Sequence, residues 1–401
     1  MQHWVLPSAA SDRVAVVGAV AMIGLLGGGQ LGRMMIQAAH QLGLRVAVLD
    51  PDPNGPASQI ADHVIVAAYD DFNALAQLGQ WADVFTTEFE NVPAESLRFL
   101  AKSGPTMPDA HSVGIAQNRI DEKRFIQATG VPVAPYAVIS RVEDCHEISP
   151  QLFPGIVKSA RLGYDGKGQQ NVDSSAEVKA AWEAMGSVDC IVEKRLALDR
   201  EISVICARDR LGHIEIFPVG ENTHRHGILA VTQVPARISP ALEQRAHECA
   251  RKIIEALKYV GVMCIEFFVL SGEQLIANEI APRPHNSGHH TIEACSVSQF
   301  EQQVRICAQL PLAQPSLRSP AVMLNILGES WFKSSDHPIE PDWDAVRAQF
   351  GVHLHLYGKS EPRPGRKMAH VTCLGATLSE ARARAIVVAD ILGLDTGRAL
   401  A

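Results

Sequence analysis

The chain has 401 residues, too many for one small module and enough for two or three packed domains. Hydrophobic residues make up 47% and charged residues 20%, which excludes a disordered or fibrous protein. Lys and Arg total 36 against 44 Asp and Glu, so the net charge is −8 and no global basic field attracts nucleic acid. We therefore expect a multidomain globular protein that binds no nucleic acid and whose basic sites are local.

The eight cysteines are spread singly, without a CxxC pair or zinc-finger spacing, which predicts buried thiols in a reducing compartment. Near the N-terminus, residues 14–29 carry no charge and follow Arg13, as the apolar part of a signal peptide would. This run is short for a membrane span and rich in glycine, and its second half fits a buried strand. We expect residues 1–21 to be an extension, Met22 to be an alternative translation start, and no membrane segment.

A dinucleotide-like motif follows the first predicted strand, residues 22–26. Residues 27–32 match G-x-G-x-x-G and open a predicted helix whose apolar residues share one face. A second strand over 45–49 ends in Asp50, where dinucleotide-binding proteins carry an acidic residue. Taken alone, these features predict a dehydrogenase, although the same glycines suit any phosphate or simply close packing of a helix on a strand.

Further strands are predicted at 64–66 and 84–87, with a crossover helix at 71–80. Together with the first two strands they predict an open parallel sheet. The segment 86–91 then lies at the carboxyl end of a strand, which is where open α/β sheets bind ligands.

A second glycine-rich segment lies at 163–169, directly after a short predicted strand at 156–158. Its glycines and lysine lack the spacing of a Walker loop. They predict a hairpin flap whose amides cover phosphates while Lys158 supplies a positive charge; an ordinary surface hairpin is the alternative. Farther on, the strand end at 191–196, followed by Glu201, suits an adenine edge and a ribose diol, although such residues are also typical of a solvated strand end.

Two apolar stretches, 262–270 and 275–281, flank a four-residue turn and predict a β-hairpin. If Leu270 pairs with Leu275, Glu266 lies opposite Glu279 on one face, a destabilising pair unless a cation lies between them. Mg²⁺ prefers such carboxylates together with substrate phosphates. A register slip that exposes one glutamate is the alternative. In ideal pairing Asn278 faces away, so a ligand role for it requires a bulge or a twist.

Donor-rich segments follow this hairpin. Residues 283–291 combine a cation with neutral donors and suit a small oxyanion. A zinc site competes with this interpretation, but the adjacent His289 and His290 fit no H-x-x-x-H spacing. Residues 359–367 hold four cations, which predicts either a site for a phosphate monoester or a solvated basic loop. Two phosphate-handling segments and a metal hairpin together indicate phosphoryl transfer rather than hydride transfer.

At this point the chain resembles the ATP-grasp enzymes of purine synthesis, most closely the 5-(carboxyamino)imidazole ribonucleotide synthases. The resemblance covers residue 22 to about residue 379. Its motifs are Gly27 to Met34, Thr87 to Pro93, Gly163 to Gln169, Glu266, Asn278 to Thr291 and Arg363 to His370. In that family the first glycine unit looks like a Rossmann relic that holds the imidazole ribonucleotide without nicotinamide, which argues against the dehydrogenase.

The resemblance implies an α/β protein with the ATP-grasp fold. Its expected parts are an N-terminal extension (1–21), a Rossmann-like parallel-sheet domain (22–118), a subdomain with the glycine flap (119–200), the metal hairpin with a C-terminal lobe (201–385) and a C-terminal tail (386–401). A linker-like stretch at 311–320 joins the hairpin region to the last lobe.

The implied activity is the ATP-dependent carboxylation of 5-aminoimidazole ribonucleotide with bicarbonate. It would pass through carboxyphosphate and yield 5-(carboxyamino)imidazole ribonucleotide, ADP and phosphate. The resemblance also implies ATP and Mg²⁺ as cofactors, a cytoplasmic location and a homodimer. The alternatives are a formate-dependent phosphoribosylglycinamide transformylase, whose flap usually lacks the Tyr164-Asp165 pair, and a non-catalytic ATP-binding regulatory protein, which would not need the opposed Glu266 and Glu279.

The resemblance also assigns site residues, motif by motif. It implies catalytic roles for Arg283, His285, Asn286 and Lys359, of which the first three form the bicarbonate and carboxyphosphate pocket. ATP would contact Arg119, Lys158, Gly163, Tyr164, Asp165, Gly166, Lys167, Gly168, Gln169, Glu193, Lys194, Arg195, Leu196, Glu201, His224, Asn278 and Glu279. The ribonucleotide would contact Gln30, Glu88, Tyr164, Lys359, Arg366 and Lys367, and magnesium would bind Glu266 and Glu279.

Three features limit this transfer of roles. Lys123 lies one helical turn from Arg119 and is an alternative to it. The chain also departs from the family pattern by its 21-residue extension and by Ala369, where the family usually has glycine.

Overall fold

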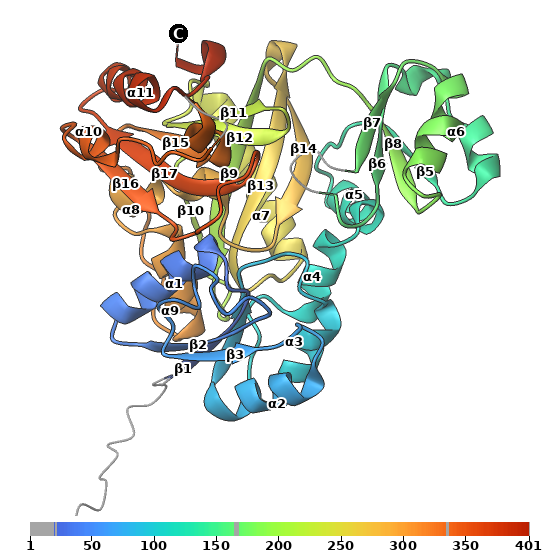
Figure 1. Ribbon diagram of the computed structural model, residues 1–401. Coiled ribbons are helices and arrows are strands. Elements are labelled where there is room, and N and C mark those ends of the chain that lie inside the picture. Colours follow the sequence, from blue (N-terminus) through green and yellow to red (C-terminus); the bar gives the residue numbers. More distant parts are fainter. Residues whose placement is uncertain (1–19, 21, 164–167, 334–336, 401) are drawn as a thin grey trace, which may run out of the picture.

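The structure is a computed structural model that describes residues 20, 22–163, 168–333 and 337–400. Across these residues the strands form one parallel sheet and two antiparallel sheets. Figure 1 shows the parallel sheet below the largest sheet, with the small sheet and helix α6 to one side. None of the described helices has the length and apolar character needed to span a membrane.

The N-terminal sheet is parallel, with strand order β3-β2-β1-β4. Its strands are β1 (Met22–Leu26), β2 (Arg45–Asp50), β3 (His63–Val66) and β4 (Val84–Thr87). Its helices are α1 (Gln30–Gln41), α2 (Phe72–Trp81), α3 (Ala94–Leu100) and α4 (Ala110–Ala116). β1 and β4 are buried throughout, as expected of strands covered on both faces. The predicted open parallel sheet is confirmed.

The small sheet is antiparallel and has strand order β5-β8-β6-β7. Its elements are β5 (Tyr136–Ile139), β6 (Gly155–Ser159), β7 (Gln169–Val172), α6 (Ser175–Ala184) and β8 (Cys190–Lys194), preceded by α5 (Arg119–Ala128). Lys158 of β6 pairs with Gln169 of β7, so the glycine-rich segment connects two strands of a hairpin, as predicted. Its residues 164–167 lie outside the described part.

The largest sheet contains nine antiparallel strands in the described part, in the order β14-β13-β9-β11-β12-β15-β17-β16, with β10 beside β9. They are β9 (Arg200–Arg208), β10 (Ile214–Ile216), β11 (Gly220–Arg225), β12 (Ile228–Val234), β13 (Gly261–Leu270), β14 (Gln274–Ala281), β15 (Ala321–Leu327), β16 (Val352–Leu356) and β17 (Lys367–Leu374). Its helices are α7 (Pro240–Ala256), α8 (Thr291–Ala294), α9 (Gln299–Cys307), α10 (Trp343–Arg347) and α11 (Leu378–Leu392).

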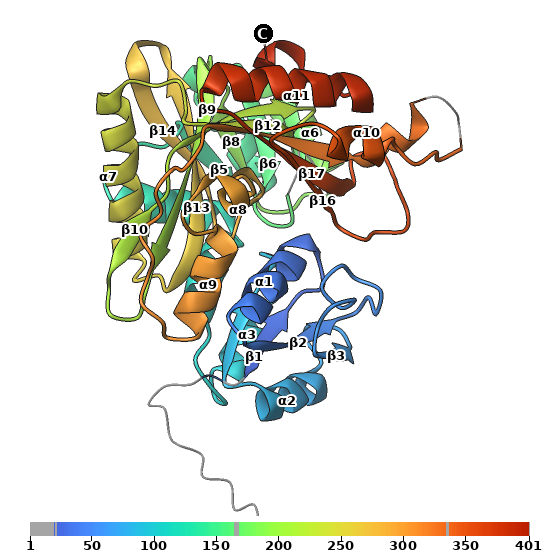
Figure 2. The same ribbon diagram turned by 90° about the vertical axis from the view of Figure 1, so that its left-hand side faces the viewer.

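Helix packing joins these sheets into one body. α7 repeats buried apolar residues at helical spacing, including Leu242, Ala246 and Ala250, and they share a core with residues of β9 and β13. α9 packs against α1, so a helix of the C-terminal half touches the N-terminal domain (Figure 2). The carboxyl edge of the parallel sheet is thereby held close to the large sheet.

The C-terminal segment is part of this core. The expected tail begins at residue 386, inside α11, which continues to Leu392 and ends at Gly393 in the left-handed conformation. Beyond it, Ala399 and Leu400 are buried with residues of β15 and β17, because the lobe needs their apolar surface to cover its sheet. Ala369, the departure from the family pattern, is buried in β17 within the apolar core and pairs with Ile326 and Leu356.

Candidate active site

One cavity of about 1000 Å³ collects residues from the two antiparallel sheets, from α1 and from the segment that follows β4. It is open between the N-terminal domain, the small sheet and the metal hairpin. The predicted site residues that line it are Gln30, Glu88, Arg119, Lys158, Gly163, Gln169, Glu201, His224, Glu266, Asn278, Glu279, Arg283, His285, Asn286, Lys359, Arg366 and Lys367. Residues far apart in the sequence therefore meet in one place.

The hairpin of β13 and β14 pairs its two glutamates, although its register near the turn differs from the predicted one. The turn contains three residues, not four, and Leu270 pairs with Gln274, so the predicted register near the turn is wrong. A β-bulge then shifts the ladder by one residue, and Glu266 pairs with Glu279 as predicted. The extra residue is Asn278, which also lines the cavity. The bulge that a ligand role for Asn278 required is present.

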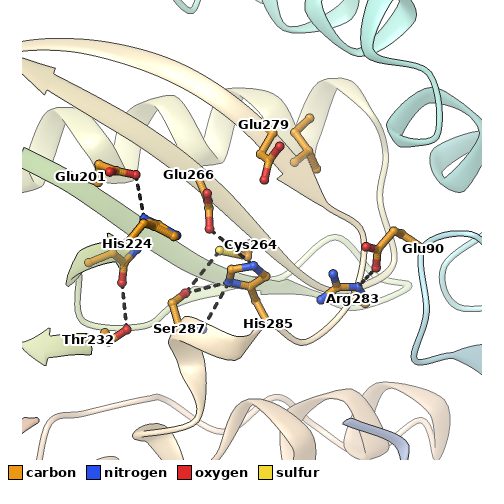
Figure 3. A network of polar contacts seen from close by, with 12 residues as sticks. Glu90, Glu201, His224, Thr232, Cys264, Glu266, Glu279, Arg283, His285 and Ser287 are labelled. Carbon is orange, nitrogen blue, oxygen red and sulfur yellow. Dashed lines mark hydrogen bonds and ion pairs between the residues drawn. The ribbon is translucent and has the colours of Figure 1, made fainter. Parts of the chain in front are cut away.

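The paired carboxylates repel each other in a buried setting. Burial of Glu266, together with the neighbouring charge of Glu279, raises the pKa of Glu266 above its ordinary value. Glu201 of β9 adds a third carboxylate to the same cavity (Figure 3). Within the ranges that the structure describes, no group of three or more His, Cys, Asp or Glu residues is arranged to hold a metal ion.

His224 faces these carboxylates. Its Nδ1 atom lies 2.9 Å from Glu201 Oε2. Burial alone would lower the pKa of His224, but the Glu201 hydrogen bond and the charge of Glu266 raise it to about 9. His224 is therefore a cation at neutral pH and contributes positive charge to the wall that holds Glu201.

The segment after β14 presents donors to the cavity. His285 Nε2 lies 3.4 Å from Glu266 Oε1, and its Nδ1 accepts the Ser287 amide at 3.3 Å (Figure 3). Burial lowers the pKa of His285 well below its ordinary value, so the ring is neutral and carries its proton on Nε2. Asn286 is 7% exposed, and neither its amide nitrogen nor its amide oxygen has a hydrogen-bond partner among the residues that the structure describes. A buried amide without partners is available to a ligand.

Arg283 links this segment to the N-terminal domain. Its guanidinium forms an ion pair with Glu90, which follows β4 (Figure 3). Burial opposes ionisation of Glu90, but Arg283 outweighs it and lowers the pKa of Glu90. The cation is thus held at a defined place on the cavity wall by a residue that the sequence-based assignment omitted.

Lys158 is held from below by Glu193. Glu193 Oε1 lies 3.2 Å from Lys158 Nζ, and Glu193 Oε2 lies 2.9 Å from Lys123 Nζ. Lys123 is fully buried and does not line the cavity, whereas Arg119 does and lies 3.4 Å from Glu279. This geometry favours Arg119 over Lys123 as the residue exposed to ATP. Glu193 itself is buried beneath the cavity and does not line it.

The end of β8 and part of the flap do not reach this cavity wall. Lys194, Arg195 and Leu196 do not line it, and Arg195 lies 3.7 Å from Asp173. Gly168 accepts the Ser159 amide through its carbonyl, at 2.9 Å. Tyr164, Asp165, Gly166 and Lys167 lie outside the described residues. The ATP contacts assigned to these positions stay predictions.

The first glycine motif packs two carboxylates against the backbone. Asp50 Oδ2 accepts the Gly28 amide at 2.5 Å, while Glu88 accepts the Gly29 and Gly32 amides at 2.9 and 3.1 Å. A Cβ atom on Gly29 would lie 2.5 Å from Glu88 Oε1, so a larger residue there would displace the Glu88 carboxylate. These contacts show the glycine amides bound by two carboxylates, and a phosphate site at this motif stays a prediction. Glu88 caps α1 while also lining the cavity.

A basic corner completes the cavity near α1. Lys359 Nζ donates to Gln30 Oε1 at 2.9 Å and to the Lys367 carbonyl at 2.8 Å. Burial lowers the pKa of Lys359 to about 8, and Arg366 acts in the same direction. Two predicted substrate residues from opposite ends of the chain, Gln30 and Lys359, are therefore in direct contact.

Several lining residues were missed by sequence reasoning. They include Glu90, Glu122 and Arg363. Glu90 lies inside the Thr87 to Pro93 motif, and Glu122 lies one turn after Arg119 on α5. Their closeness in sequence to an assigned motif or residue is the signal that could have indicated them. Spacing alone does not show which neighbour turns toward the cavity.

The sequence matches three protein families in succession. Residues 20–117 match the ribonucleotide synthetase preATP-grasp domain, residues 124–300 the ATP-grasp domain, and residues 321–384 the phosphoribosylaminoimidazole carboxylase C-terminal domain. A curated N5-carboxyaminoimidazole ribonucleotide synthase of Brucella melitensis is 44% identical over 353 residues, which cover 87% of this chain and 95% of the relative. The chain belongs to the N5-carboxyaminoimidazole ribonucleotide synthase family.

Solved structures of this family have the same fold. The N5-carboxyaminoimidazole ribonucleotide synthetase of Thermus thermophilus is 37% identical with a TM-score of 0.87, and the match covers 94% of this chain and 100% of that one. The enzyme of Aspergillus clavatus, in complex with ADP and 5-aminoimidazole ribonucleotide, is 31% identical with a TM-score of 0.84, over 93% of this chain and 98% of that one. The predicted ATP-grasp fold with its N-terminal Rossmann-like domain is confirmed.

Proposed function

We propose that this chain carboxylates 5-aminoimidazole ribonucleotide with bicarbonate and ATP, yielding N5-carboxyaminoimidazole ribonucleotide, ADP and phosphate in purine biosynthesis. The observation that carries the proposal is the single cavity in which Glu266 and Glu279 stand opposite each other beside Arg283, His285 and Asn286. Family membership supports the reaction, and the cavity supports the assignment of its parts.

ATP occupies the part of the cavity bounded by the small sheet and the hairpin in this proposal. Lys158 and Arg119 supply positive charge at its phosphates, and the glycine flap between β6 and β7 closes over them. Magnesium fits Glu266 and Glu279, because the two opposed carboxylates need a cation and leave room for phosphate oxygens. When bound, it would neutralise charge on the transferred phosphoryl group.

Bicarbonate is held by Arg283, His285 and Asn286. Arg283 contributes a fixed cation, the neutral His285 ring a directed N–H, and Asn286 an amide group that no other described residue hydrogen-bonds. A bicarbonate oxygen attacks the γ-phosphorus, the bond to ADP breaks, and carboxyphosphate forms. The closed flap keeps water from this labile product. The ribonucleotide amine then attacks the carboxyl carbon and forms the C–N bond, the bond to phosphate breaks, and the leaving phosphate takes the amine proton.

The ribonucleotide occupies the basic corner in this proposal. Gln30, Lys359, Arg366 and Lys367 surround space between α1 and the Arg363 to Lys367 segment. Cations there suit a phosphate monoester. Its position across the cavity from the flap would set the amine toward the bicarbonate pocket. The homodimer implied by the resemblance is part of the same proposal and is checked by light scattering of the purified protein.

The deciding experiment measures ADP release with MgATP while bicarbonate and 5-aminoimidazole ribonucleotide are each added or omitted. We expect release that requires bicarbonate and rises strongly with the ribonucleotide, with the carboxylated product detected by mass spectrometry. Stimulation by formate and glycinamide ribonucleotide instead would identify the transformylase. No release under either condition, with retained ATP binding, would identify the regulatory protein.

A further inference from the structure

β14 is an edge strand of the largest sheet, so the amides on its outer side need partners beyond the sheet. The Ala277 amide donates to the Pro132 carbonyl at 2.8 Å. The next such contact along the strand is made by the Ile280 amide, which donates to Glu122 Oε1 at 2.5 Å. These two amides are three residues apart rather than the two of a regular strand, because Asn278 is the extra residue of the bulge.

Helix α5 contacts two adjacent residues of β14, directly after the bulge residue Asn278. Arg119, in its first turn, lies 3.4 Å from Glu279 Oε2. Glu122, one turn later on the same face, holds the amide of Ile280. Figure 1 shows α5 beside β14, and the two elements are in contact. Glu279, a proposed metal ligand, and Ile280, the residue after it, therefore both contact α5.

The Glu122 side chain is placed for this contact. Glu122 is 3% exposed, and among the described residues the Ile280 amide is the hydrogen-bond donor to its carboxylate. Burial raises its pKa to about 8, although Arg119 opposes the shift. A buried carboxyl group is costly unless a specific interaction uses it. The interaction here reaches across 158 positions of the sequence, directly beside the carboxylates of the hairpin.

We propose that Glu122 is a positioning residue that locks the β14 bulge through the Ile280 amide, so that Asn278 and Glu279 both face the cavity. Without this contact the strand can return to the register set by its turn, in which Glu266 would face Asn278. Glu122 thereby governs metal-dependent nucleotide binding through the backbone of β14. The inference rests on the proposed metal role of Glu279.

The test compares E122A and E122D with E122Q. Aspartate keeps the carboxyl group but is one methylene too short to reach Ile280, whereas glutamine keeps an acceptor oxygen at the same place. D121A, an exposed carboxylate on the same helix, is the matched control. Two quantities are measured for each protein: the affinity for a non-hydrolysable ATP analogue with and without Mg²⁺, and deuterium uptake of the peptide that spans β14.

Mg²⁺ should increase the affinity of wild-type protein for the ATP analogue. In E122A and E122D we expect this increase to be at least about fivefold smaller, because the Ile280 amide loses its partner. Metal-free affinity should stay within about twofold of wild type, and β14 should exchange faster. E122Q and D121A should match wild type. E122D replaces E122A if the alanine variant does not fold.

Three results would overturn the proposal. In the first, E122D keeps both the wild-type increase in affinity on adding Mg²⁺ and the wild-type deuterium uptake of β14. In the second, E122D loses the same affinity with and without Mg²⁺, and in the third, E122Q is as impaired as E122D. A failure of the proposed metal role of Glu279 would give a different result. If wild-type protein gains no affinity from Mg²⁺, the assignment of Glu279 falls, while deuterium uptake of β14 still decides whether Glu122 holds the bulge.

Discussion

Glu266 and Glu279 stand directly opposite each other because the hairpin ladder slips by one residue between them and the turn. The three-residue turn pairs Leu270 with Gln274, a register that on its own would place Asn278 across from Glu266. The bulge adds one residue on β14 and restores the glutamate pair. It also brings Asn278 to the cavity, so one irregularity delivers two adjacent polar side chains to the site.

E266Q tests the carboxylate pair. We expect ribonucleotide-dependent ADP formation to fall at least about 100-fold, because the neutral amide cannot help neutralise a bound cation and the phosphoryl charge is left unbalanced. Steady-state ADP release across a Mg²⁺ titration measures the effect. E215Q, a partly exposed carboxylate on β10 of the same sheet, is the control. Near-normal ATPase activity in E266Q would contradict the metal assignment.

The charge of Lys359 should control ribonucleotide binding. Burial lowers its pKa to about 8, so the ammonium is charged below pH 8 and is lost as pH rises through that value. We expect the KM for the ribonucleotide to increase up to about tenfold per pH unit above pH 8. The measurement is the pH profile of KM from about pH 6.5 to about pH 9.5, a range that brackets this pKa. In K359R the guanidinium stays charged, and the rise should disappear. A flat wild-type profile would refute the role.

Glu193 is expected to stabilise the small subdomain. It pairs with both Lys123 and Lys158, and these lysines lower its pKa although burial acts against them. E193Q leaves two buried ammonium groups without a counter-charge, and we expect the free energy of unfolding to fall by about 3 kcal/mol at pH 7. Urea unfolding followed by circular dichroism measures it. E183Q, which removes an exposed pairing with Lys179, should change stability by less than about 0.5 kcal/mol.

The pH dependence of this contribution has a defined sign. The folded pKa of Glu193 lies below its ordinary value, so the stabilisation is present above the ordinary carboxyl pKa and is lost as pH falls through the folded value. The stability difference between wild type and E193Q should therefore shrink in acid. A difference that grows on acidification would show that another group is responsible.

Asn286 should act on bicarbonate rather than on ATP. Its amide group is buried next to His285 and has no hydrogen-bond partner in the described part of the chain. N286D places a negative charge there, and we expect the KM for bicarbonate to rise at least about tenfold while nucleotide affinity changes little. Initial rates in bicarbonate-depleted buffer measure the first quantity and calorimetry the second. S296A, outside the cavity, serves as control. An equal loss of ATP affinity would place Asn286 at the nucleotide instead.

Much of the fold was readable from local pattern. The parallel sheet, the helix after the glycine motif and the β13–β14 hairpin all have periodicities that short stretches of chain carry by themselves. Motif order also led to the family. The glycine motif was less decisive, because glycine only permits a close approach. The structure shows that the group approaching Gly29 is the carboxylate of Glu88.

The sequence by itself determined the strands and helix around the first glycine motif, the hairpin of the two glutamates, the order of the motifs and the inventory of charged groups. Only the tertiary structure decided which of those groups share a cavity. Burial and contact depend on side chains brought from distant positions: Lys359 meets Gln30, Glu90 meets Arg283, and Glu122 meets Ile280. Local spacing does not identify such partners, because they come together only when the sheets pack and each buried polar group forms a hydrogen bond or ion pair.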